Sequence, residues 1–310
     1  MYHIKTWEAA KGRWRGILAA LGVPQAALSG RHGPCPLCGG KDRFRWDNKE
    51  GSGSYICSVC GAGTGFQLAQ RFVGGEFADV ASKIDALLGN IKHDPAQRPA
   101  LSDDEKRAGL RRLFAESSPI SDGDLASVYL ASRGFAGPTM PCDLRFAPRI
   151  QDGQGGLRSA MVAVVRDAEG RPVNLHRTFL APDGGSKADC AAPRKMMPGS
   201  IPAGAAVRLA APTMGGELGI AEGIETALAC ERLFDLPVWS AISAGGLAKW
   251  APPPGVSDVA IFGDCDASFT GQAAAYALAR RLVAAGVSVV VRIPDTMGQD
   301  WADVWGAKCG

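Results

Sequence analysis

The stretch ELGIAEGIETALACERLF, residues 217–234, decides the fold because it passes from a buried strand to a helix within two residues. Leu218 to Ala221 is an apolar run of strand length, and Gly223 permits a tight turn directly after Glu222. The apolar residues from Ile224 to Phe234 then recur at helical spacing. A strand followed at once by a helix predicts one unit of a parallel sheet.

The same alternation continues toward the end of the chain. Three further apolar stretches follow, PVWSAI (237–242), VAIFGD (259–264) and VSVVVRI (287–293), and the helical stretch GQAAAYALARRLVAAG (271–286) lies between the last two. Strands alternating with helices predict a parallel sheet with right-handed crossovers. Residues 213–310 are therefore expected to form an α/β domain.

Acidic side chains stand where these predicted strands end. Glu222 follows ELGIA, and Asp264 and Asp266 follow VAIF. Ligands of parallel sheets bind beyond the carboxyl ends of the strands, and residues two apart on an extended segment point the same way. We expect these three carboxylates to meet at one rim, where Mg²⁺ or Mn²⁺ would relieve their repulsion.

Two further acids follow the last predicted strand. Asp300 and Asp303 could add ligands to the same cation. The alternative is structural, with Asp300 as a helix N-cap and Asp303 in the first helical turn, where a negative charge is favourable. Glu225, one turn into the helix after Glu222, either supports the site or lies on the surface.

The amino-terminal part of the chain carries a cysteine cluster. Four of the nine cysteines form two CxxC pairs, Cys35 with Cys38 and Cys57 with Cys60, each followed by glycine. Four thiolates suit the tetrahedral coordination of one Zn²⁺, and a segment this small needs a metal to fold. His32 is a rival ligand, but a fifth ligand is not needed.

Cations alternate with aromatic rings between the two cysteine pairs. Lys41, Arg43 and Arg45 are interleaved with Phe44 and Trp46. Such alternation suits single-stranded nucleic acid, which is held by charge and by base stacking. The alternative is that the two rings form the small core of the ribbon.

Charge is uneven along the chain, although the net charge is only +3. Residues 1–72 contain ten Lys/Arg against four Asp/Glu, and residues 140–212 contain ten against six. Residues 213–310 contain six against eleven. A basic front and middle favour a polyanionic partner, and an acidic end favours metal binding, although solvated surface charge alone would also explain the pattern.

The chain is expected to be an α/β multidomain protein. We predict an N-terminal helix (Thr6 to Leu21) with a small β zinc ribbon in 1–66, a helical linker region in 67–135, a basic α+β subdomain in 136–212 and the parallel-sheet domain in 213–310. Ser102 with Glu105 predicts a capping box in the helical region. The polar stretch 90–100, with two prolines, is expected to be a linker.

Several of these residues resemble known families. EGIETAL (222–228), FGDCDASFTG (262–271) and GQDWADV (298–304) resemble the three motifs of the Toprim domain, found in bacterial-type primases, type IA and II topoisomerases, some nucleases and a recombination mediator. HGPCPLCGGKDRFRWD (32–47) with YICSVCGAGTGFQLA (55–69) resembles the zinc ribbon of phage and plasmid primases. Residues 156–201 are similar to the basic subdomain that precedes Toprim in primases.

The resemblance implies a DNA primase that synthesises short RNA primers on single-stranded DNA from NTPs. It implies that Glu222 acts as acid/base and that Asp264 and Asp266 hold Mg²⁺. Bacterial replicative primases carry a carboxylate four residues after the motif glutamate, where this chain has Thr226. Contacts to template or triphosphate are implied for the basic residues Arg158, Arg177, Arg194 and Lys195. Lys249 is expected to contribute less to template binding, because residues 213–310 are net acidic.

Two rival functions share these features. A Toprim nuclease would use similar metal carboxylates, and a non-catalytic DNA-binding module of the recombination-mediator kind would also combine zinc with Toprim. No P-loop motif occurs, so a replicative helicase is expected on a separate chain. The sequence lacks an apolar run near the roughly 20 residues of a membrane helix and lacks a signal-peptide pattern at its start, which predicts a cytoplasmic protein.

Overall fold

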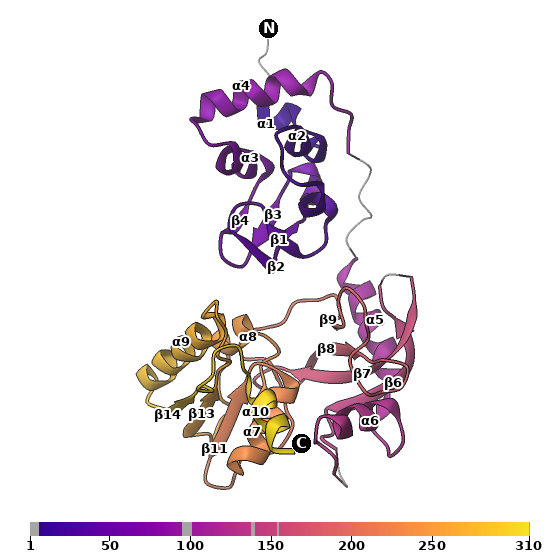
Figure 1. Cartoon of the computed structure of the whole chain (residues 1–310), viewed down its shortest axis with the longest axis vertical. Coiled ribbons are helices and arrows are strands. Elements are labelled where there is room, and N and C mark those ends of the chain that lie inside the picture. The colour runs from indigo at the N-terminus through magenta and orange to yellow at the C-terminus, as the bar shows by residue number, and fades with distance from the viewer. Residues whose placement is uncertain (1–5, 95–100, 138–139, 154, 310) are drawn as a thin grey trace. The chain divides into compact units, whose positions relative to one another are not determined.

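The computed structural model describes residues 6–94, 101–137, 140–153 and 155–309. The chain forms two compact units, Met1–Pro99 and Ala100–Gly310 (Figure 1). The first unit is built on one hydrophobic core and the second on three neighbouring clusters of buried side chains. Separate cores are the property that defines separate domains.

A small antiparallel sheet carries the cysteines of the first unit. Its strands lie in the order β1-β2-β3-β4, with bounds β1 (Gly33–Cys35), β2 (Gly39–Trp46), β3 (Tyr55–Cys57) and β4 (Gly61–Gly63). One CxxC pair sits in the turn between β1 and β2, and the other sits between β3 and β4. The predicted zinc-ribbon fold is confirmed.

Short helices pack around this sheet: α1 (Thr6–Ala9), α2 (Trp14–Ala20), α3 (Gly65–Val73) and α4 (Phe77–Leu88), with 3-10 turns η1 (Gln25–Ser29) and η2 (Lys49–Gly51). The single helix predicted from Thr6 to Leu21 is wrong. The chain is interrupted at Gly12, whose φ of 73° lies in the left-handed region that a continuous helix excludes.

Helices α3 and α4 belong to the ribbon unit. Phe66, Leu68, Val80 and Ile84 from these helices are buried in the same core as Trp14 of α2. The predicted helical region 67–135 is therefore divided between the two units. The apolar side chains of its first half pack into the core of the first unit. Of the predicted linker 90–100, residues 95–100 lie outside the described residues.

The second unit contains the predicted parallel sheet. Its strands lie in the order β14-β13-β11-β12 and pair in parallel, with bounds β11 (Glu217–Ala221), β12 (Val238–Ser240), β13 (Asp258–Phe262) and β14 (Ser288–Arg292). Helices α7 (Ile224–Phe234) and α10 (Trp301–Cys309) pack together against one face through Phe234, Phe262 and Trp301. Helices α8 (Ala244–Lys249) and α9 (Thr270–Ala284) contribute to the core on the other face (Figure 1).

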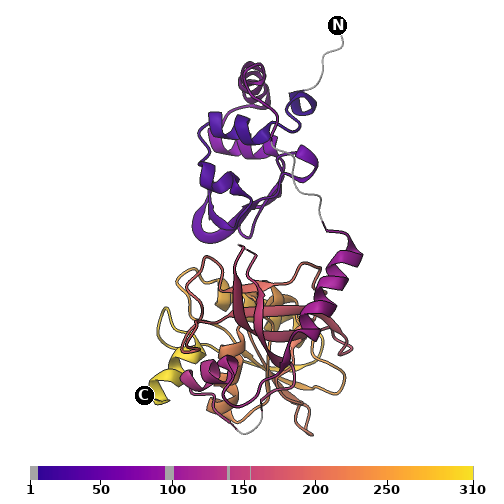
Figure 2. The same ribbon diagram turned by 90° about the vertical axis from the view of Figure 1, so that its right-hand side faces the viewer.

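An antiparallel set of strands precedes the parallel strands in the same unit. It comprises β5 (Ser118–Pro119), β6 (Leu144–Gln151), β7 (Leu157–Arg166), β8 (Pro172–Phe179), β9 (Arg194–Met196) and β10 (Ala206–Val207). Figure 2 shows these strands with helix α5 (Asp103–Ala115) beside them. Helix α6 (Leu125–Ser132) contributes Ala126, Tyr129 and Leu130 to the core. The predicted capping box of Ser102 and Glu105 is confirmed at the start of α5.

The short strand β10 joins the two sets of strands into one ten-stranded sheet. Ala206 and Val207 pair with β7 on one side, and Val207 pairs with Ser240 of β12 on the other. The regions predicted as separate domains, 136–212 and 213–310, therefore share one continuous sheet. The predicted α/β fold class is confirmed.

The helices of the described residues are short, and the longest of them, α9, has 15 residues. Within the described ranges, no helix combines the length and the apolar character that crossing a membrane requires.

Candidate active site and metal centre

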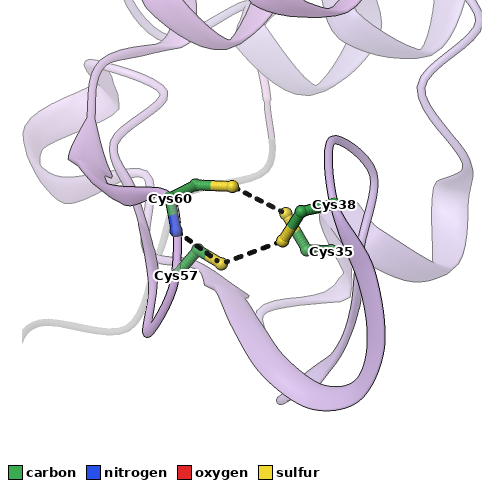
Figure 3. Close-up of side chains that lie close together, drawn as sticks. All are labelled: Cys35, Cys38, Cys57 and Cys60. Carbon is green, nitrogen blue, oxygen red and sulfur yellow. Dashed lines mark hydrogen bonds between the residues drawn. The ribbon is translucent and has the colours of Figure 1, made fainter. Parts of the chain in front are cut away.

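The four CxxC thiols of the first unit point toward one another (Figure 3). The Sγ atoms of Cys35 and Cys60 lie 4.0 Å apart, those of Cys38 and Cys57 lie 3.8 Å apart, and all four lie within 4.8 Å of one another. Zinc–sulfur bonds of about 2.3 Å in a tetrahedron place the sulfurs about 3.8 Å apart. The thiols therefore fit one Zn²⁺, as predicted.

Backbone amides donate to two of the four sulfur atoms, those of Cys35 and Cys57. The N–H groups of Leu37 and Cys60 donate to the Sγ atoms of Cys35 and Cys57 over 3.4 and 3.3 Å. Burial alone would raise the pKa of the Cys57 thiol, but hydrogen bonds from the Cys60 and Val59 amides lower it to about 7. Arg71 of α3 donates to the Cys60 carbonyl over 3.2 Å, which fixes the second turn.

The strand between the two cysteine pairs separates its cations from its rings. Successive side chains of β2 alternate between two faces, so Phe44 and Trp46 are buried while Arg43 and Arg45 face outward. Trp46 is only 2% exposed. The predicted stacking of Trp46 on bases is therefore corrected, because its ring belongs to the core of the first unit. Lys41 is exposed, and Arg45 pairs with Asp47.

A cavity of about 630 Å³ opens at the carboxyl ends of the parallel strands in the second unit. Turns after β11 and β13 bring Glu222 and Asp264 to its wall, and the start of α10 brings Asp300 and Asp303. Cations line the same cavity: Arg133 at the end of α6, Lys187 in the loop after β8, and Arg194 of β9. The cavity thus brings together acids from 213–310 and bases from the preceding 104–209 region.

The acids in this cavity raise one another's pKa values. Burial, followed by the charges of Glu222 and Asp300, raises the pKa of Asp264 to about 7. Burial likewise raises the pKa of Glu222 and of Asp300. One oxygen of Asp264, Oδ1, is buried without a hydrogen-bond partner. A buried orphan oxygen among crowded carboxylates fits a hard divalent cation such as Mg²⁺.

These carboxylates are nevertheless less tightly gathered than the thiols. Across the described residues, the four cysteines are the single group of at least three metal-binding side chains whose ligand atoms all lie within 4.8 Å of one another. Glu222 and Asp264 line the same cavity, and the predicted convergence of both with Asp266 at one rim stays a prediction.

Asp266 does not line the cavity but faces the start of helix α9. Its Oδ1 accepts hydrogen bonds from the Ser268 and Thr270 amides over 2.9 and 3.2 Å, and its Oδ2 accepts one from Gly271 over 2.8 Å. Although partial burial opposes the shift, these hydrogen bonds lower the pKa of Asp266. The helix amides are the reason for this orientation, because they lack partners within the helix.

Asp300 and Asp303 form the predicted start of a helix and also line the cavity. The Asp303 amide donates to Asp300 Oδ1 over 2.9 Å, and the Asp300 amide donates to Asp303 Oδ2 over 3.1 Å. This reciprocal cap starts α10 and leaves both carboxylates on the cavity wall.

Two neighbouring basic residues of β9 lie on opposite faces of the sheet. In the strand register, Arg194 lies beside Thr178 of β8 and Lys195 lies beside Arg177. Arg194 lines the cavity, and Lys195 points to the opposite face. Arg177 is only 8% exposed and donates to the carbonyls of Gln151 and Met196, so its predicted contact with template is corrected.

The two remaining predicted cations lie away from the cavity lining. Arg158 pairs with the buried carboxylate of Asp152 at 3.1 Å. Lys249 is exposed at the end of α8. Neither residue is therefore placed to meet a ligand inside the cavity.

Sequence reasoning missed Lys187, Tyr129 and Arg133 as site residues. Lys187 Nζ lies 2.8 Å from Glu225 Oε1, and the Tyr129 hydroxyl donates to the same oxygen over 2.6 Å. The carboxylate is nearly buried, yet the Lys187 charge and these bonds lower its pKa to about 2, against the opposing effect of burial. The contacts of Glu225 reach residues 38 and 96 positions away, so no local pattern reveals them. The sequence signals only the acid itself, in the first turn of α7.

Three segments match known families. Residues 30–66 match the zinc-binding domain of primase-helicase, and residues 217–309 match the Toprim domain. Residues 104–209 match a domain of unknown function, DUF7146. The two resemblances drawn from the CxxC pairs and from the acidic motifs are confirmed.

Solved primase structures also resemble the chain at low identity. A crystal structure of the Aquifex aeolicus primase (zinc binding and RNA polymerase domains) shares 18% identity over 89% of this chain and 76% of that one, with a TM-score of 0.40. The primase fragment of the bacteriophage T7 primase-helicase protein shares 19% over 88% and 92%, with a TM-score of 0.38. A DNA primase domain from Pseudomonas aeruginosa shares 15% over 52% of each chain, with a TM-score of 0.33.

Proposed function

Because the chain joins a primase-type zinc ribbon to a Toprim domain, we propose that it is a DNA primase, which makes short RNA primers on single-stranded DNA by Mg²⁺-dependent nucleotidyl transfer. The observation that carries the proposal is the cavity of the second unit. There Glu222, Asp264 and Asp300 line the same cavity as Arg194 and Lys187. Acids that can hold a divalent cation beside cations that can hold phosphates are the groups that phosphoryl transfer requires.

Each group in the cavity has a proposed task. Asp264, with Asp300 and Asp303, would hold Mg²⁺, and Asp266 would join them by leaving its hydrogen bonds at the start of α9. The bound cation would neutralise charge on the attacking and leaving oxygens. Glu222 is the proposed acid/base, because burial raises its pKa and so favours its taking up a proton. Arg194 would offset the negative charge of the triphosphate.

The remaining functional assignments concern the template and the partners. Lys41, Arg43 and Arg45 on the outer face of the ribbon would hold single-stranded DNA through its phosphates. We propose NTPs as substrates, a replicative helicase on a separate chain as partner and the cytoplasm as the site of action. Arg158, Lys195 and Lys249 would add at most general attraction for the template, because none of them lines the cavity.

A primer-synthesis assay tests the proposal. The protein is incubated with single-stranded DNA, labelled NTPs and Mg²⁺, and short labelled products are resolved by length. We expect Asp264→Asn to lower the yield at least about a hundredfold, as loss of a metal-positioning group does in enzymes that rely on electrostatic stabilisation. Asp258→Asn is the matched control, because Asp258 starts β13 whereas Asp264 follows its end.

The same assay separates the rival functions. Degradation of labelled DNA with no primer made would identify a nuclease. Binding of DNA without synthesis or cleavage would identify a binding module. Either result in the wild-type protein would overturn the proposed function.

A further inference from the structure

We propose that Lys187 is a binding residue for the phosphate chain of the nucleoside triphosphate and that Glu225, supported by Tyr129, is the positioning residue that holds the Lys187 ammonium at the cavity wall. The inference rests on the proposed primase function. Lys187 and Tyr129 lie in the 104–209 region, whose family is a domain of unknown function. The inference therefore gives that region a role in the site.

The position of Lys187 is set by contacts rather than by regular structure. It lies in the loop between β8 and β9, where its only strand-like pairing is an isolated bridge to Leu180. The tip of this loop packs on helix α6, since Ser132 Oγ donates to the Gly185 carbonyl over 3.1 Å. Gly184 leaves so little room that an added Cβ would lie 3.0 Å from Val128. The loop is thus fixed against the same helix that carries Tyr129.

The carboxylate of Glu225 is more buried than the ammonium of Lys187. Both residues line the cavity, but the Glu225 side chain is 11% exposed and the Lys187 side chain is 28% exposed. Tyr129 donates its hydroxyl to the Oε1 atom that also meets Lys187 Nζ. A lysine side chain has several freely rotating bonds, and ordering it costs conformational entropy. The ion pair with Glu225 orders Lys187 in advance, so phosphate binding would not incur that cost.

A purely structural role is a poor explanation for this cluster. Buried ion pairs contribute little to stability compared with apolar side chains of the same size, because both charges lose their hydration. This pair also lies on the wall of the cavity that contains Asp264 and Arg194. An ammonium carries three N–H donors, and Glu225 occupies one of them. Two donors therefore remain for a ligand.

The chemistry of the wall points to a polyphosphate. Arg133, Lys187 and Arg194 come from three different elements and line the same cavity as carboxylates that suit a divalent cation. A triphosphate with a divalent cation would need both kinds of group, cations for its phosphates and carboxylates for its metal. Repulsion between Glu225 and the phosphates is reduced because the Lys187 ammonium offsets the carboxylate charge and the Tyr129 hydroxyl hydrogen-bonds the same oxygen.

Equilibrium titration of ATP with Mg²⁺ into the full-length protein tests this inference alongside primer synthesis. We expect Lys187→Met to raise the Kd for ATP by about tenfold, the effect of losing one charge-assisted hydrogen bond. Glu225→Gln should raise it by about fivefold, the cost of ordering one long side chain again. The double variant should match Lys187→Met alone, because Glu225 acts through Lys187. Lys187→Arg should recover most of the affinity.

Matched controls come from an exposed ion pair on helix α5. Lys106 Nζ lies 2.7 Å from Asp103 Oδ1, and Lys106→Met or Asp103→Asn should leave the Kd for ATP unchanged. Thermal unfolding of every variant identifies those that fold. The double variant leaves no unpaired buried charge, so it provides a folded comparison even if Glu225→Gln or Lys187→Met is destabilised.

Three results would overturn the inference. They are an unchanged Kd in folded Lys187→Met, a tighter Kd in Glu225→Gln, or additive losses in the double variant. If wild-type protein makes primers while the variants bind ATP normally, the proposed function stands and the role of Lys187 falls. If wild-type protein makes no primers, the primase proposal fails, and an absence of ATP binding would remove the role of Lys187 as well.

Discussion

The two candidate metal sites of this chain are built in opposite ways. The four thiols of the ribbon lie within 4.8 Å of one another and come from two tight turns separated by 18 intervening residues. The acids of the second unit come from separate turns after β11 and β13 and from the start of α10. No group of three or more of these acids in the described ranges gathers within the same distance.

The difference shows what each site requires from its fold. Cysteine thiols are neutral when protonated, so local turns can bring them together without strong repulsion. Carboxylates are charged at neutral pH, and a large sheet must hold them near one another against that repulsion. We therefore expect the zinc site to hold its fold together and the acid site to tolerate loss of its ligands.

The largest expected effect is the loss of the ribbon when a cysteine is changed. Cys57→Ser should release zinc and unfold the first unit, because structural zinc in small domains contributes about 10–16 kcal/mol to folding. The second unit should keep its own thermal transition, since it has separate cores. Zinc content by elemental analysis and differential scanning calorimetry measure the two effects.

An exposed cysteine of the second unit provides the control for this prediction. Cys142→Ser removes a thiol that lies outside the cluster, so zinc content should stay at about one per chain. Freshly reduced wild-type protein without zinc, or Cys57→Ser protein with a full zinc complement, would contradict the assignment of the ligands.

A smaller effect is expected when an acid of the cavity is changed. Asp264→Asn should raise the unfolding temperature of the second unit in the absence of Mg²⁺. Burial and the charge of Glu222 both destabilise the ionised Asp264 carboxylate, and the neutral amide removes this cost. Saturating Mg²⁺ should stabilise the wild type by about 3 kcal/mol at a hundred times its Kd, but should not stabilise the variant. Calorimetry with and without Mg²⁺ measures both, and equal responses of the two proteins would argue against a cation at Asp264.

A pH effect of at most about 3 kcal/mol is expected from a buried histidine beneath the cavity. Burial lowers the pKa of His176 from 6.5 to about 4, so the unfolded chain takes up a proton first as the pH falls. Neutral His176 leaves the free energy of unfolding at its full value above about pH 6.5, and this stability is lost as the pH falls from 6.5 to 4. His176→Gln should remove this loss, so its stability relative to the wild type should rise as the pH falls from 6.5 to 4. Because the raised pKa of Asp264 adds stability over the same range, the difference between the two proteins is the measurement, and identical curves would refute the assignment. His32→Gln, in the other unit, should leave the curve unchanged.

The smallest effect compares two neighbouring cations on opposite faces of β9. Arg194→Met should raise the Kd for ATP by about tenfold, as loss of one charge-assisted contact does. Lys195→Met should leave it nearly unchanged, because Lys195 faces away from the cavity. Titration of both variants measures the difference, and a larger loss for Lys195→Met would reverse the assignment of the two faces.

Sequence reasoning was reliable where the signal is local. The CxxC spacing located the zinc ligands, the strand and helix alternation from residue 217 onward located the parallel sheet, and Ser102 with Glu105 located a helix start. Each pattern depends on residues within a few positions of one another. The two-residue period of β2 also contained the information that Phe44 and Trp46 share a buried face, but the interleaved cations favoured the other interpretation.

The missed positions of Arg177 and Lys187 involve contacts between distant residues, whereas the competing partners of Asp266 are its neighbours along the chain. Nothing near Arg177 shows that its guanidinium would be buried against the carbonyls of Gln151 and Met196. Asp266 follows its strand as a ligand would, yet the amides at the start of α9 compete for its oxygens. Lys187 meets its partner from 38 residues away, so only the folded chain places it in the site.

The pairing of β10 with β7 and β12 determines how the cavity can respond to a ligand. Its acidic and basic walls stand on one hydrogen-bonded sheet, and a core that contains Met161, Leu180, Ala221 and Phe262 continues beneath both. A hinge between the walls would have to break this sheet and divide its core. Adjustment to an arriving nucleotide is therefore expected on the nanosecond timescale of side-chain rotation and loop motion, rather than on the millisecond timescale of domain closure.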